Sequence, residues 1–86
     1  MVARPVYKTV IVRRGRRGDV GFRVAHNEDG EAVVELTDDR PLPVKDGDVL
    51  IAVMGSLINP NLKKARKQID KAGDKFTMDV LTRVWD

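Results

Sequence analysis

The stretch Arg13–Val24, RRGRRGDVGFRV, combines five arginines with three glycines and then runs into an apolar segment. The segment before it, Val6–Arg13, is rich in β-branched residues and predicts a strand. Phe22 and Val24 begin a second strand after the loop, Gly15–Gly21. Because glycine reaches backbone conformations that other residues avoid, the three glycines give this loop unusual backbone freedom beside concentrated positive charge.

Turn signals and apolar runs further along predict two more strands joined by an irregular crossing. Asp29-Gly30 is typical of a tight hairpin turn, and Asp46-Gly47 is a second turn signal. Two prolines between these turns argue against regular structure, because proline lacks an amide donor and restricts the residue before it. A nearly continuous apolar run then predicts a strand buried on both faces. In chain order these segments are a third strand at Ala32–Thr37, a crossing at residues 38–45 and a fourth strand at Asp48–Met54.

One amphipathic helix of about three turns and a closing strand are predicted for the last third of the chain. Asn59-Pro60 is a good helix start, because asparagine caps amides and proline is tolerated in the first turn, although Asn61 could cap instead. Gly73 is the predicted C-terminal cap, and Lys75–Val84 alternates apolar and polar residues as a strand does. The apolar stripe of the helix comprises Leu62, Ala65, Ile69 and Ala72.

These elements predict a mainly β fold with one principal α-helix. The expected architecture is a small, partly open antiparallel β-barrel or sandwich in which the helix covers one seam. The length of 86 residues allows one core, so we expect a single domain, 1–86, with its ordered core at about residues 5–84.

The composition excludes several classes of function. With no cysteine and one histidine, the chain offers no disulfide and no thiolate or multi-histidine metal site, and no cofactor is expected. The longest apolar run, Val49–Met54, is too short to span a bilayer, which favours a cytoplasmic protein. Carboxylates such as Asp38 and Asp39 have no nucleophile or base beside them, so no catalytic site is expected. The net charge of +3 suggests an acidic partner.

Three segments, in this order, resemble a PDZ domain, the module that captures the C-termini of other proteins. RRGRRGDVGF, residues 13–22, is similar to the basic residue and the Gly-Leu-Gly-Phe carboxylate-binding loop of that family. VKDGDVLIAVMG, residues 44–55, is similar to its Gly-Asp-containing strand. LKKARKQIDKAGDKFTMDVL, residues 62–81, resembles its groove helix and last strand, so the resemblance extends over Tyr7–Arg83.

The chain departs from the family pattern at three places. Asp19 replaces the first glycine of the loop, and Met54 stands where asparagine is common. DDRPLPV, residues 38–44, replaces the segment that forms a short second helix in the family, so that helix is expected to be reduced or absent.

The resemblance implies a non-enzymatic protein-interaction module, alone or within a scaffold, that binds the C-terminal tails of partner proteins. The tail would add a strand between the second strand and the helix. The backbone amides of Val20, Gly21 and Phe22 would hold its carboxylate, and Arg14, or Arg17 in its place, would add attraction. The implied peptide groove comprises Arg23, Val24, Ala25, Leu62, Ala65, Arg66 and Ile69.

The residues of the helix indicate which residues the ligand would have at and before its C-terminus. Leu62 stands where the family often has a histidine that reads a Ser or Thr hydroxyl, so an apolar antepenultimate ligand residue is expected. Lysines crowd the helix surface and repel one another, so acidic residues upstream of the ligand terminus are expected to strengthen binding. The pocket for an apolar terminal side chain is expected to comprise Val20, Phe22, Val24 and Ile69.

The alternative function is that of a basic surface module that binds anionic lipid headgroups or nucleic acid. The arginine-rich loop and the lysine-rich helix motivate it. Nucleic acid is not expected as a partner, because the few aromatic residues form no stacking strip. An anionic membrane surface stays compatible with these charges, either directly or through membrane-associated partners.

Overall fold

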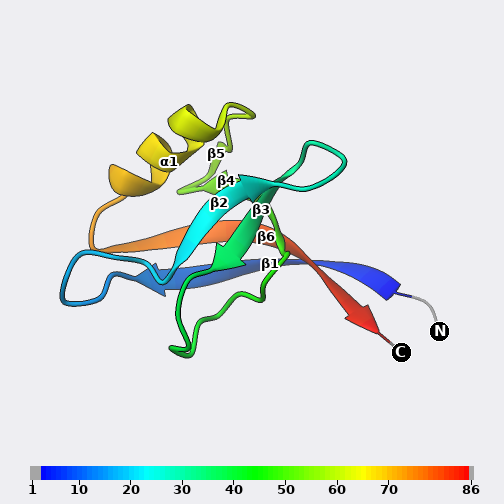
Figure 1. Ribbon diagram of the computed structural model, residues 1–86, viewed down its shortest axis with the longest axis horizontal. Coiled ribbons are helices and arrows are strands. Elements are labelled where there is room, and N and C mark those ends of the chain that lie inside the picture. Colours follow the sequence, from blue (N-terminus) through cyan, green and yellow to red (C-terminus); the bar gives the residue numbers. More distant parts are fainter. Residues whose placement is uncertain (1–2, 86) are drawn as a thin grey trace.

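The computed structural model describes residues 3–85, in which six strands form one antiparallel sheet that does not close (Figure 1). The strand order is β1-β6-β4-β3-β2, and β5 pairs with β4 alone. The fold is therefore mainly β with one helix and a partly open sheet, as the sequence predicts, and residues 3–85 contain no second helix. The elements are β1 Ala3–Arg13, β2 Phe22–His26, β3 Ala32–Leu36, β4 Val49–Val53, β5 Ser56–Leu57, α1 Leu62–Asp70 and β6 Lys75–Trp85.

The two longest strands form a ribbon that carries much of the core. β1 and β6 pair without a register shift from Ala3 opposite Trp85 to Arg13 opposite Lys75. One face of the ribbon turns inward and places Phe76, Met78 and Val80 in the core, as the alternation in the last strand predicts. The far end of the ribbon extends beyond the rest of the sheet, so both chain ends lie there (Figure 1).

The core lies between the curved sheet and the helix. Its members come from every element except β5, and α1 contributes Ala65 and Ile69. The largest side chains that are almost wholly buried are Phe76, Leu50, Met78, Val12, Val24, Val34 and Val80.

Helix α1 is shorter than predicted. The side chain of Asn61 accepts from the amide of Lys64, so Asn61 is the N-cap and the helix begins at Leu62. Asn59 does not cap the helix: its side-chain oxygen accepts from the amide of Asn61, which orders the residues just before the cap. The helix ends at Asp70 and its C-cap is Lys71, so the prediction of Gly73 as the cap is wrong. Gly73 lies two residues further on, with a φ of 89° that glycine adopts without strain. Among residues 3–85, no helix has both the length and the apolar character required to cross a bilayer.

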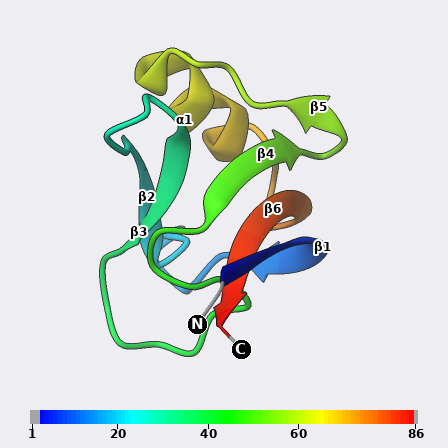
Figure 2. The same ribbon diagram turned by 90° about the vertical axis from the view of Figure 1, so that its right-hand side faces the viewer.

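The connections match the predicted turns except at one hairpin. Gly30 and Gly47 both have positive φ, as the two Asp-Gly signals predict, and residues 37–48 cross as an irregular segment at the end of the molecule away from α1 (Figure 2). The short strand β5 was not predicted. A turn at Met54-Gly55, where both residues have positive φ, folds β5 back onto β4.

Candidate functional site

Strand β2 forms one edge of the sheet, and its pairing decides which backbone groups face outward. The amide of Thr37 donates to the carbonyl of Gly21 at 3.0 Å, and the β2–β3 register continues unbroken from this bond. In an antiparallel ladder, residues alternate between those that bond to the neighbouring strand and those that do not. Phe22 and Val24 therefore direct their N–H and C=O groups away from β3, toward the side where α1 packs (Figure 1).

A pocket of about 220 Å³ lies between β2 and α1. Its apolar lining consists of four side chains, all of which were predicted to form the pocket for the ligand's terminal side chain: Val20, Phe22, Val24 and Ile69. Charged residues rim it. The lining residues are Val20, Phe22, Arg23, Val24, Arg66, Ile69 and Asp70.

Some residues predicted for the groove lie outside this pocket. Ala65 has no exposed surface and belongs to the core beneath the helix. Leu62 is half-buried at the start of the helix and packs against the core. Ala25 is half-buried, and its backbone groups belong to the ladder with β3, as do those of Arg23, whose side chain pairs with Glu35. The backbone edge therefore consists of alternate residues of β2 and not of the whole predicted run.

The sequence did not predict a role for Asp70 at the pocket. This exposed carboxylate lies one helical turn after Arg66, so the spacing of the groove face could have revealed it. A carboxylate at this position repels a ligand carboxylate.

Arg14 holds the glycine loop against the end of the helix. Its guanidinium donates to the carbonyls of Gly73 at 2.7 Å and Gly18 at 3.1 Å, and also to the carbonyl of Ile69. The guanidinium carbon also lies 5.5 Å from the centre of the Phe76 ring, within the range of a cation–π contact. Arg14 does not line the pocket, so these contacts give it a structural role in addition to the electrostatic one predicted from the sequence.

Arg40 holds the other side of the loop. Its guanidinium lies 2.5 Å from a carboxylate oxygen of Asp19 and 2.7 Å from one of Asp38. Asp19, the residue that departs from the family pattern, therefore anchors the loop to the crossing between β3 and β4. The hydrogen bond from Arg40 lowers the pKa of Asp38 below its usual 3.8, so this pairing stabilises the fold above that pH and weakens as the pH falls through the lowered pKa.

Two contacts cross from the helix side to the β2 edge. A guanidinium nitrogen of Arg66 donates to the carbonyl of Val24 at 3.2 Å. The ring nitrogen Nε2 of His26, at the end of β2, lies 2.9 Å from the carbonyl of Pro60. One acceptor of the open edge is thus occupied by the protein's own side chain.

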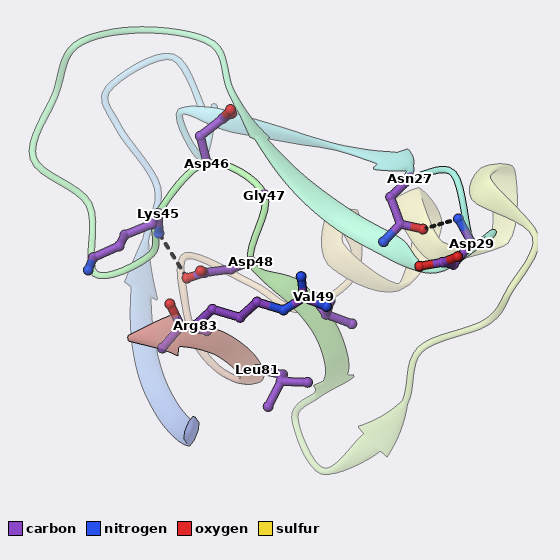
Figure 3. Close-up of a pocket in the computed structure, with 10 residues that line it drawn as sticks. Asn27, Asp29, Lys45, Asp46, Gly47, Asp48, Val49, Leu81 and Arg83 are labelled. Atoms are coloured by element: carbon purple, nitrogen blue, oxygen red, sulfur yellow. Dashed lines mark hydrogen bonds between the residues drawn. The ribbon is translucent and has the colours of Figure 1, made fainter. Parts of the chain in front are cut away.

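A larger hollow of about 350 Å³ lies away from the groove and is mainly polar (Figure 3). Its polar side chains hold turns: the carboxylate of Asp48 accepts from the amide of Lys45 at 2.9 Å, and the side-chain amide oxygen of Asn27 accepts from the backbone amide of Asp29 at 3.0 Å. Within residues 3–85, no three His, Cys, Asp or Glu side chains are grouped as a metal site. The lining residues are Asn27, Asp29, Lys45, Asp46, Gly47, Asp48, Val49, Leu81, Thr82 and Arg83.

No protein-family model matches the chain, and no curated protein matches it in sequence. The features that bear on function are the geometry of the groove and the three motifs that resemble the PDZ family.

Proposed function

We propose that this chain is a PDZ-like, non-enzymatic module that binds the C-terminal tails of partner proteins in the cytoplasm by adding them as a strand to β2. The observation that carries the proposal is the outward-facing edge of β2 beside an apolar pocket that is also lined by Val20 of the glycine loop. Strand addition to such an edge supplies main-chain hydrogen bonds, and a pocket beside it selects side chains.

The glycine loop supports recognition of a free carboxylate. Gly18 and Gly21 have φ values of 78° and 80°, which allow successive amides to turn toward one point. In the proposed complex the amides of Val20, Gly21 and Phe22 donate to the carboxylate. The ligand's terminal side chain enters the pocket between Phe22 and Ile69.

The ligand's other preferences follow from the helix. Leu62 offers an apolar contact and no hydrogen bond at the first helical position, so an apolar antepenultimate residue is favoured over Ser or Thr. The exposed lysines of α1 favour acidic residues further upstream. They are Lys63, Lys64 and Lys67, and Lys71 follows at the helix end.

The decisive experiment compares a peptide that ends in Leu-x-Val with its C-terminally amidated twin by calorimetric titration. We expect the amidated peptide to bind at least about tenfold more weakly, because it loses the charge in bonds that contribute roughly 1.5–3 kcal/mol each when charged. A third peptide with Ser at the antepenultimate position is expected to bind more weakly than the first. Equal affinities for the acid and the amide would refute the carboxylate site. Binding to anionic vesicles with no peptide binding would favour the alternative function.

Arg66 is expected to compete with the ligand, because it occupies the Val24 carbonyl that an added strand requires. Replacing it with methionine keeps the aliphatic stem and removes the donors. We expect Arg66→Met to bind a neutral peptide about three- to tenfold more tightly, the equivalent of one net hydrogen bond. For a peptide with upstream Glu the gain is smaller, since the variant also loses an attractive charge.

The matched control is Lys67→Met, which removes the same charge from the next position of the helix without breaking a bond to β2. We expect this variant to bind the neutral peptide with unchanged affinity. If Arg66→Met weakened binding of the neutral peptide, Arg66 would be a ligand contact and not a competitor.

A further inference from the structure

The opposite edge of the sheet is also open. The amide of Arg14 donates to the carbonyl of Asp74 at 2.9 Å and extends the unbroken β1–β6 register. By the alternation of antiparallel bonding, the even-numbered residues of β1 bond to β6. Tyr7, Thr9 and Ile11 therefore direct their N–H and C=O groups outward, and within residues 3–85 no strand pairs with this edge.

The same strand carries unusual apolar exposure. Of the five large apolar side chains that are exposed among the described residues, three lie on β1: Val6, Tyr7 and Ile11, at 39%, 72% and 51%. Exposed edges normally avoid such residues, because an open strand with apolar side chains pairs with other strands. β1 carries four residues of the kinds that protect an edge, Arg4, Pro5, Lys8 and Arg13, and they restrict the registers in which it can pair.

We propose that two copies of this chain pair antiparallel through β1, with the twofold axis at Thr9. Outward-facing residues must oppose outward-facing residues, so any register shifted by one residue is excluded. With the axis at Thr9, Tyr7 of each copy lies opposite Ile11 of the other, on the same face of the joined sheet. Aromatic and β-branched residues in opposite positions are a favourable cross-strand pair.

Axes at the neighbouring residues would give less stable pairing of the two strands. An axis at Lys8 places two lysines directly opposite each other, which is destabilising. An axis at Tyr7 brings Pro5 opposite Thr9, so the missing proline amide interrupts the ladder beside the axis. An axis at Val10 pairs only residues 7–13. With the axis at Thr9, Pro5 lies at the end of the ladder, where its missing donor costs least.

The dimer would be weak and would leave the peptide groove accessible. An interface limited to one strand edge is small, so we expect a dissociation constant in the micromolar to millimolar range, roughly as small transient interfaces show. β1 and β2 lie at opposite ends of the strand order, so both copies would keep their β2 edges open. Two grooves on one particle would bind a two-tailed partner more tightly than one groove does. The dimer itself does not depend on the proposed peptide binding.

Sedimentation velocity over a concentration series, up to about 1 mM, tests the association. We expect the unmodified chain to shift from monomer to dimer, and Thr9→Pro to stay a monomer, because proline removes an outward amide that does not bond to β6. The melting temperature of Thr9→Pro should confirm that it folds. A chain that is monomeric throughout, or a dimer that Thr9→Pro leaves intact, would overturn the proposal.

Introduced cysteines test the register, since the chain contains none of its own. Thr9→Cys would face itself across the axis at a Cα separation of about 5.5 Å, which a disulfide can bridge. Tyr7→Cys would lie about 14 Å from its counterpart, four residues further along, and is the matched control. In a glutathione redox buffer we expect a crosslinked dimer from Thr9→Cys and none from Tyr7→Cys. Equal crosslinking of the two variants would exclude the axis at Thr9.

Discussion

Replacing Arg14 with alanine is expected to lower the free energy of unfolding by about 3 kcal/mol, a large loss for one residue near the surface. The guanidinium serves three carbonyls: one in the glycine loop, one at the end of α1 and one just after it. Carbonyls near a helix end lack helical partners, and positive charge there is favourable. Urea unfolding followed by circular dichroism measures the loss.

Two further variants test whether the loss of stability comes from the hydrogen bonds of Arg14 and not from the loss of one positive charge in the loop. Arg14→Lys keeps the charge but presents donors from one nitrogen, so it should recover only part of the stability. Arg17→Ala removes an exposed arginine of the same loop and should change stability by less than about 0.5 kcal/mol. Equal small effects for Arg14→Ala and Arg17→Ala would show that Arg14 does not join the loop to the helix.

The contrast between these two arginines shows how far the sequence could be read. Local signals predicted every strand except the short β5, because alternation and turn residues depend on neighbours in the chain, and they predicted the helix face because its spacing is regular. Four residues predicted for one pocket, from the loop, β2 and α1, do line one pocket. The helix begins after Asn61, the alternative cap, and not after Asn59, because asparagines at 59 and 61 are equally good caps by sequence and only the fold chooses between them.

Contacts between distant segments could not be predicted. Arg14 and Arg17 have the same side chain in the same loop, and only the position of the helix end decides which of them finds acceptors. The pairing of Asp19 with Arg40 joins the loop to an irregular crossing whose path no periodicity describes. The bond from Arg66 to Val24 depends on the distance between helix and edge strand, which sequence spacing does not contain.

Alanine at Gly21 is expected to cost about 2–3 kcal/mol, whereas alanine at Gly18 should cost about 1–2 kcal/mol. Both glycines have φ near 80°, where an L-residue is strained to a similar extent. Their surroundings differ: a Cβ at Gly18 meets no atom within 4 Å, whereas a Cβ at Gly21 lies 3.0 Å from Cδ and Nε of Arg40 and 3.2 Å from a methyl of Leu42. The comparison therefore separates backbone strain from steric contact, and urea unfolding of both variants measures it.

The steric part of the Gly21 effect should depend on Arg40, because the ion pairs with Asp19 and Asp38 hold that side chain in place. Combining Gly21→Ala with Arg40→Ala removes most of the obstruction, so the cost of alanine at Gly21 should fall toward the cost at Gly18. Arg40→Ala alone should have a small effect, since exposed ion pairs contribute little. An unchanged cost of Gly21→Ala in the Arg40→Ala background would mean that the cost comes from the backbone and from Leu42, and that Arg40 does not restrict the loop where the ligand carboxylate is proposed to bind.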